Sequence, residues 1–113
     1  MRYAYLKNCM AVVPSALVNS QQIRTAVSEV EKSLAPDVVH IRFDVGEDWS
    51  GDGAIFFRIL VSDEASQNRL RKVTAEAVRR LGERLDSLDM DLFRYHNVRS
   101  VSEQAELREA AWD

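Results

Sequence analysis

Four carboxylates surround one glycine-rich turn near the middle of this chain of 113 residues. Asp44 precedes the turn, which spans residues 47–53, and Glu47, Asp48 and Asp52 lie within it. Carboxylate oxygens are ligands of hard cations such as Ca²⁺. Their spacing fits no EF-hand loop, which needs ligands at fixed positions and a glutamate at its end. Because turns also favour Asp, Gly and Ser, the sequence predicts a solvated turn rather than a metal site.

The two histidines, His40 and His96, are the other candidates for acid–base or metal chemistry. A small enzyme would need both to meet on one sheet face beside Asp44. Each histidine alternates with apolar neighbours, which is typical of an outward-facing strand residue. The sequence contains no Ser/His/Asp order, Gly-rich phosphate loop or His-Glu-x-x-His helix. We therefore predict no catalytic residue, no bound metal and no cofactor.

Aromatic and basic residues give better candidates for a binding surface. Trp49 is a large aromatic on a polar turn, where it either folds back on the sheet, which we favour, or contacts a partner. The segment 94–99 combines aromatic and cationic residues, as single-strand binders do. The predicted contact residues are Trp49, Phe56, Arg58, Leu60, Arg94, His96 and Arg99.

Composition limits the class of protein. The length predicts a single domain over residues 1–113. The net charge of −3 and a pI near 5.4 argue against general affinity for nucleic acid or anionic membrane. The lone Cys9 cannot form an internal disulfide, which favours a reducing compartment. With no apolar run of membrane-spanning length and no signal-peptide pattern at the start, we predict a cytoplasmic protein.

Two amphipathic helices are predicted from apolar residues at helical spacing. The first follows a cap at Asn19 and ends before Pro36. The second follows a cap at Ser62 and carries the stripe Leu70, Val73, Ala77, Leu81, Leu85 and Leu88. A Ser100–Glu103 capping box predicts a C-terminal helix over 100–113.

Alternating apolar residues predict strands between these helices. Val39, Ile41, Phe43 and Val45 would face the core from the first strand. Residues 55–61 and 90–98 predict two more strands, and the glycines at 46, 51 and 53 predict a turn after the first. Residues 3–13 also suit a strand, the alternative being a disordered leader over residues 1–9.

These elements predict an α+β two-layer sandwich, with two helices on one face of an antiparallel sheet. A ferredoxin-like βαββαβ order is preferred if residues 3–13 form a strand. A KH-like αββαβ arrangement is the alternative. The outer face of the second strand carries Phe56 and Leu60, which need cover. That cover could come from the stripe Val101, Ala105 and Trp112 of the terminal helix, from a second copy, or from a partner.

Two motifs and one tryptophan carry a resemblance to a known family. They are Asp48-Trp49-Ser50-Gly51-Asp52-Gly53-Ala54-Ile55-Phe56-Phe57-Arg58, then Arg99-Ser100-Val101-Ser102-Glu103-Gln104-Ala105, and Trp112. With these residues the chain resembles a small bacterial family of unassigned activity. The family is associated with genes beside HEPN-type toxin–antitoxin proteins, and the resemblance spans residues 37–112. It implies a protein partner rather than a substrate, and it brings no catalytic residue with it.

The leading hypothesis is therefore a small cytoplasmic protein-interaction module, antitoxin-like and non-catalytic, that self-associates or binds a partner protein. The alternative is a single-stranded RNA-binding domain that uses the open sheet face, although the acidic charge disfavours it.

Overall fold

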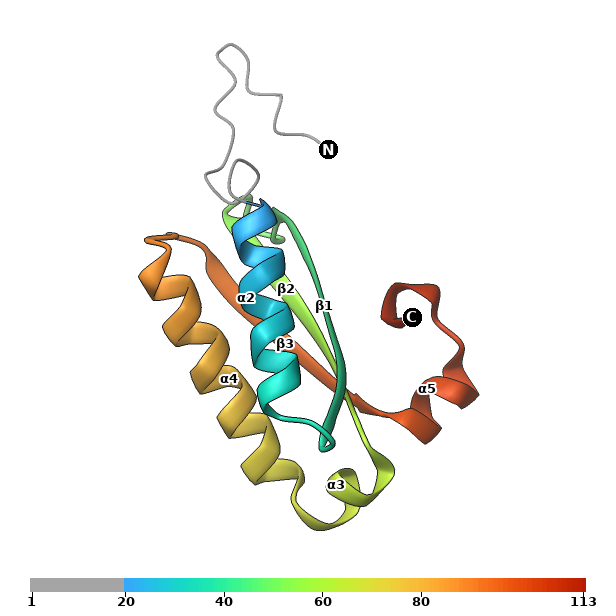
Figure 1. The fold of residues 1–113 in the computed structure, drawn as a ribbon. Coiled ribbons are helices and arrows are strands. Elements are labelled where there is room, and N and C mark those ends of the chain that lie inside the picture. Colours follow the sequence, from blue (N-terminus) through green and yellow to red (C-terminus); the bar gives the residue numbers. More distant parts are fainter. Residues whose placement is uncertain (1–19) are drawn as a thin grey trace, which may run out of the picture.

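The computed structural model describes residues 20–113, so the strand or leader predicted within residues 1–13 lies outside the described residues. The chain forms, in order, α2 (Ser20–Ser33), β1 (Val38–Glu47), β2 (Gly53–Val61), α3 (Asp63–Asn68), α4 (Leu70–Ser87), β3 (Phe93–Ser100), α5 (Val101–Leu107) and a 3₁₀ turn (Ala110–Trp112). Figure 1 shows α2 and α4 side by side over one face of the sheet. The predicted α+β class is confirmed.

The three strands lie in the order β1-β2-β3. β1 and β2 are antiparallel, but β2 and β3 are parallel and directly paired. The expectation of an entirely antiparallel sheet is therefore wrong. The physical reason is that α4 returns the chain to the end of the sheet where β2 began, so that β3 starts beside Ala54. The ferredoxin-like order is not confirmed by the strands that the structure describes.

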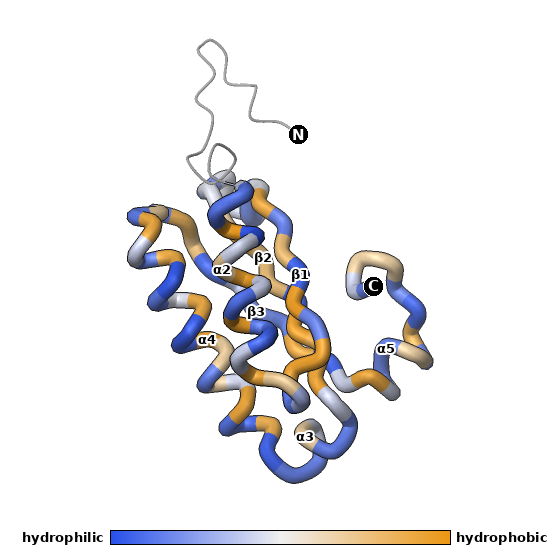
Figure 2. Tube along the Cα trace, in the orientation of Figure 1, coloured by the Kyte–Doolittle hydropathy of each residue, from blue (hydrophilic) through white to orange (hydrophobic). Residues whose placement is uncertain are grey.

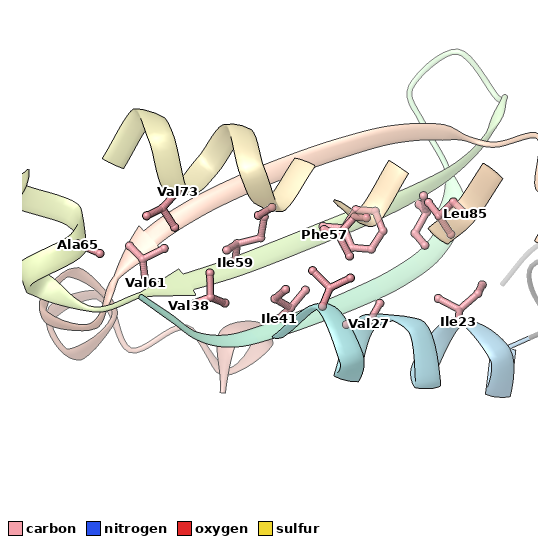
Figure 3. Packing of buried hydrophobic residues seen from close by; sticks show 14 of the residues in the cluster. Ile23, Val27, Val38, Ile41, Phe57, Ile59, Val61, Ala65, Val73 and Leu85 are labelled. Atoms are coloured by element: carbon pink, nitrogen blue, oxygen red, sulfur yellow. The ribbon is translucent and has the colours of Figure 1, made fainter. Parts of the chain in front are cut away.

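The hydrophobic core lies between the sheet and the two long helices. Ile55, Phe57, Ile59 and Val61 of β2 are fully buried. Figure 3 shows Phe57, Ile59 and Val61 facing side chains of α2, such as Val27, and of α4, such as Val73. Figure 2 shows that hydrophobic and hydrophilic residues alternate around α2 and α4, as the helical spacing predicts. The first residue of the predicted second stripe, Leu70, is instead 42% exposed.

The start of β1 differs from the predicted alternation. A β-bulge lies between Val38 and His40. Because the bulge inserts one extra residue, Val38 is buried and Val39 points outward. From Ile41 onward the expected alternation holds, and Phe43 and Val45 pack against the core.

The second predicted helix is in fact two. Ser62 caps α3 through its side chain, as expected, by accepting a hydrogen bond from the Ala65 amide at 3.1 Å. Arg69 then leaves helical geometry before α4 begins. Its guanidinium donates to Asp37 before β1 and to Glu64 of α3, and these ion pairs hold the break in place. Hydrogen bonding to the two carboxylates raises the pKa of Arg69 further above its ordinary range.

The C-terminal helix is shorter than predicted. The Ser100–Glu103 capping box is present, which confirms the predicted start. α5 ends at Leu107, and Arg108 takes a left-handed conformation that turns the chain into the 3₁₀ segment. The predicted stripe is therefore broken: Val101 and Ala105 are exposed, whereas Trp112 is buried.

Candidate interaction surface

The face of the sheet opposite α2 and α4, called here the open face, is divided into rows by the strand register. Paired residues of neighbouring strands project on the same side of a sheet. The open-face rows across β1, β2 and β3 are Gly46, Ala54 and Phe93; Asp44, Phe56 and Tyr95; Arg42, Arg58 and Asn97; and His40, Leu60 and Arg99. The aromatic residues of these rows all lie in the first two, and the arginines all lie in the last two. The open face therefore has two chemically different halves.

The aromatic half is completed by the turn between β1 and β2. The rings of Phe56 and Tyr95 are stacked, with centroids 5.3 Å apart. Trp49 of the turn lies beside Tyr95, with its ring centroid 5.6 Å from that of Tyr95. Phe93 lies two residues before Tyr95 on the same face and is 57% exposed. Trp49, Phe56, Phe93 and Tyr95 are called the aromatic patch below.

Hydrogen bonds fix the turn that carries Trp49. The Asp48 carboxylate accepts from the backbone amides of Ser50 and Asp52, at 2.9 and 3.1 Å. Its other oxygen accepts from the Tyr95 hydroxyl at 2.8 Å, which ties the turn to β3. Gly51 adopts a φ of 85°, a conformation that glycine takes without steric cost. The turn thus fixes the backbone that carries Trp49 and leaves its side chain largely exposed.

The ionisation of Asp48 and Tyr95 is coupled through this hydrogen bond. Partial desolvation raises the pKa of Asp48, but the bonds from Tyr95 and from the turn amides outweigh it, so the pKa lies below its ordinary value. The hydrogen bond to Asp48 raises the pKa of Tyr95. At neutral pH, therefore, Asp48 is an anion and Tyr95 is a neutral donor.

Trp49 does not fold back on the sheet, so the favoured of its two predicted positions is wrong. The side chain is 84% exposed, because the turn extends beyond the last strand pair, Glu47 with Gly53, although its ring lies beside that of Tyr95. The second predicted position, in which the indole is free to contact a partner, describes the geometry.

The arginine half of the open face is occupied by the chain itself. Arg58 pairs with Asp44, and Arg42 donates to the backbone carbonyl of Asp113. Arg99 donates to Gln104 and pairs with Glu109, both at 2.8 Å, while its guanidinium lies 4.2 Å from the ring centroid of Trp112. The C-terminal segment thus returns to this half of the sheet, where it contacts Arg42 and forms an ion pair with Arg99.

Two of the predicted contact residues are not on the open face. Arg94 and His96 pair with Ile55 and Phe57, so they project toward the helices. Arg94 forms an ion pair with Asp86 at 2.6 Å and lies against Gly82, where a side chain would crowd its guanidinium. His96 stacks on Phe57, with centroids 5.3 Å apart. The alternation of β3 separates these two residues from Arg99 and Tyr95.

The histidines also do not meet. His40 lies on the edge strand β1, where its Nδ1 is 3.0 Å from Glu31 of α2. His96 lies on β3, with β2 between them, and on the other face. The juxtaposition that a histidine-based enzyme requires is therefore not formed. Within residues 20–113, no group of three His, Cys, Asp or Glu side chains could hold a metal ion.

Of the seven predicted contact residues, the structure places Phe56, Arg58, Leu60 and Arg99 on the open face, with Trp49 at its end. Sequence reasoning left out Phe93, and it included Tyr95 only as part of the segment 94–99, not among the contact residues. The signal was present, because Phe93, Tyr95 and Asn97 alternate with Arg94 and His96 along one strand. Only the parallel register, which sets Tyr95 beside Phe56, identifies the face to which each set belongs.

We expect the half-buried His96 to make folding stability depend on pH. Desolvation, with a smaller effect from the Arg94 charge, lowers its pKa, and its buried Nε2 has no hydrogen-bond partner among the described residues. The unfolded chain therefore binds a proton near pH 6.5 that the folded chain takes up only at lower pH. Stability is full above pH 6.5 and falls on acidification toward the lower native pKa, by at most about 1.4 kcal/mol per pH unit.

Urea titrations between pH 8 and 5 measure this dependence. His96→Phe should flatten the curve between pH 6.5 and 5.5, while His40→Phe, the matched control, should retain it. An unchanged slope in His96→Phe contradicts the prediction.

Comparisons with known proteins gave no significant match: no family model, no curated protein and no solved structure. In the part of the chain that the structure describes, no helix is both long and apolar enough to cross a membrane.

Proposed function

We propose that this chain is a protein-interaction module and that the aromatic patch is its contact surface. The observation that carries the proposal is Trp49, whose side chain is 84% exposed on a turn that hydrogen bonds keep ordered. Tryptophan and tyrosine are enriched among the residues that contribute most to binding at protein interfaces, and a loop that is already ordered loses less entropy on binding. The surface needs no catalytic group to act. The antitoxin-like role implied by the sequence resemblance remains part of this proposal.

The fold that supports this surface is proposed to be KH-like. The order helix, strand, strand, helices, strand over residues 20–100 agrees with the KH-like arrangement that the sequence offers as its alternative. KH domains clamp nucleic acid with a Gly-x-x-Gly loop. The four glycines of this chain, at positions 46, 51, 53 and 82, include no pair with that spacing. This chain therefore lacks the Gly-x-x-Gly loop with which KH domains bind nucleic acid.

Single-stranded RNA binding is the second candidate, and the stacked pair Phe56 and Tyr95 is the observation in its favour. Affinity for RNA also requires cations that are free to meet phosphates. The open-face arginines Arg42, Arg58 and Arg99 are instead engaged by Asp113, Asp44 and Glu109. The balance of these contacts favours a protein partner.

Photo-crosslinking from the patch tests the proposal. A benzophenone amino acid replaces Trp49 in the full chain, which is then illuminated in extract of its source cells with and without ribonuclease. We expect a protein adduct that is identified by mass spectrometry, survives ribonuclease and is competed by the unmodified chain. The same probe at Leu107, which is 56% exposed in α5 away from the patch, is the control.

Two outcomes would overturn the proposal. Equal adducts from positions 49 and 107 would mean that exposure alone explains the crosslinking. Loss of every position-49 adduct after ribonuclease treatment would transfer the function to RNA.

A further inference from the structure

The aromatic patch lies at a strongly acidic end of the molecule. Residues 43–57 and 85–93 contain no lysine, arginine or histidine. Over the same two stretches the chain carries seven carboxylates, which are Asp44, Glu47, Asp48, Asp52, Asp86, Asp89 and Asp91. The two stretches meet in space, because Asp52 and Gly53 line one hollow together with Asp91, Leu92 and Phe93. Two loops distant in sequence thus build one acidic surface.

Three of these carboxylates are used within the fold. Asp44 pairs with Arg58, Asp86 pairs with Arg94, and Asp48 holds the turn and Tyr95. The others, Glu47, Asp52, Asp89 and Asp91, are exposed, and within residues 20–113 none of them forms an ion pair. Asp52 and Asp91 also flank the exposed Phe93 in the hollow. The negative charge left over therefore lies beside the exposed aromatic rings.

We propose that the occupant of the aromatic patch is a cationic segment of a partner protein, whose arginine or lysine side chains lie on the exposed Trp49 ring and pair with Asp52 and Asp91. Aromatic faces attract cations, tryptophan most strongly. Arginine suits such a site because its planar guanidinium both stacks and pairs with carboxylates. The inference rests on the proposed function and adds the chemistry of the partner to it.

The charge of the surface argues against two other occupants. An RNA strand would bring phosphates toward Glu47, Asp52 and Asp91, which would repel it. A second copy seated patch to patch would bring the two acidic ends together, since a two-fold contact places the same surface on both sides. A cationic segment alone complements both the rings and the carboxylates.

A pair of synthetic peptides tests the charge directly. The probe is the octapeptide Gly-Arg-Gly-Arg-Gly-Arg-Gly-Arg, and its control carries citrulline, which keeps the shape of arginine without its charge. Calorimetry on the full chain should give binding of the arginine peptide that weakens as salt is raised, and at least tenfold weaker binding of the citrulline peptide.

Matched variants locate the binding. Trp49→Ala should weaken the arginine peptide about tenfold, and Asp52→Asn combined with Asp91→Asn about fivefold. Glu106→Gln, which removes a charge from exposed α5, should leave the affinity unchanged. Because Trp49, Asp52 and Asp91 are all exposed, these variants are expected to fold, and unfolding curves check this.

The inference is overturned if the arginine peptide does not bind at millimolar concentration, if citrulline binds equally, or if the patch variants bind as the parent does. A dimer that Trp49→Ala dissociates, or an oligonucleotide that competes for the patch, would identify a different occupant and also overturn it. These failures are separable from failure of the proposed function. A ribonuclease-resistant protein adduct from position 49 would then still support an interaction module, with a partner of different chemistry.

Discussion

Replacing Phe57 by alanine is expected to lower the free energy of unfolding by about 3–5 kcal/mol. Phe57 is 0% exposed and is among the largest fully buried side chains in the core. It projects from the central strand toward the helices (Figure 3), so its loss removes packing on several elements at once. A close-packed interior cannot collapse fully into a cavity of that size. Because the free energy of unfolding of a domain is typically about 5–15 kcal/mol, the variant should lose a large share of its stability.

Urea denaturation followed by circular dichroism measures this change. Phe93→Ala is the matched control, because Phe93 is the same residue type, lies in the neighbouring strand and is 57% exposed. Phe93→Ala should lower the free energy of unfolding by no more than about 1 kcal/mol. Equal costs for the two variants would mean that the core is not centred on β2.

Replacing Trp112 by alanine is expected to release the C-terminal segment from the sheet. Trp112 is 6% exposed and lies against the guanidinium of Arg99. Replacing a buried aromatic residue by alanine lowers the free energy of unfolding by about 3–5 kcal/mol. We expect the lower value, about 3 kcal/mol, because Trp112 lies outside the main hydrophobic cluster. Such a loss corresponds to roughly 100-fold more frequent opening. The polar contacts of Gln104 and Glu109 with Arg99 are exposed in part and cannot replace it.

Hydrogen exchange resolved by residue tests this expectation. The amides of α5 should lose protection in Trp112→Ala, while those of β2 keep it. Leu107→Ala, in the same segment but at a residue that is 56% exposed, is the control and should change little. Protection that is unchanged in α5 would mean that the capping box at Ser100 holds this segment without the tryptophan.

The two halves of the open face differ in how far other parts of the chain contact them. The C-terminal segment covers the arginine half, where Asp113 and Glu109 meet Arg42 and Arg99. No such cover reaches the aromatic patch among the described residues, since Trp49 stays 84% exposed. The surface proposed for binding therefore includes two aromatic side chains, Trp49 and Phe93, that the described residues leave mostly exposed.

The amino-acid sequence by itself determined the local elements. The spacing of Ile23, Val27 and Val30 dictated α2, and the alternation of Ile55, Phe57 and Ile59 dictated the buried face of β2. The caps at Ser62 and Ser100 and the turn glycines set where several of these elements begin and end. These signals are readable because each depends on neighbours within about four residues. The same local rules placed Phe56 and Leu60 on the outer face of β2.

The tertiary structure alone decided which elements meet. The parallel pairing of β3 with β2 set Tyr95 on Phe56 and turned Arg94 and His96 toward the helices. A shift of one residue in that register would exchange the two sets, and no local pattern fixes it. The left-handed Arg108 likewise directed Trp112 back to Arg99, although helical spacing predicted a continuous stripe. Long-range packing, rather than local propensity, therefore determined the surface on which the proposed function depends.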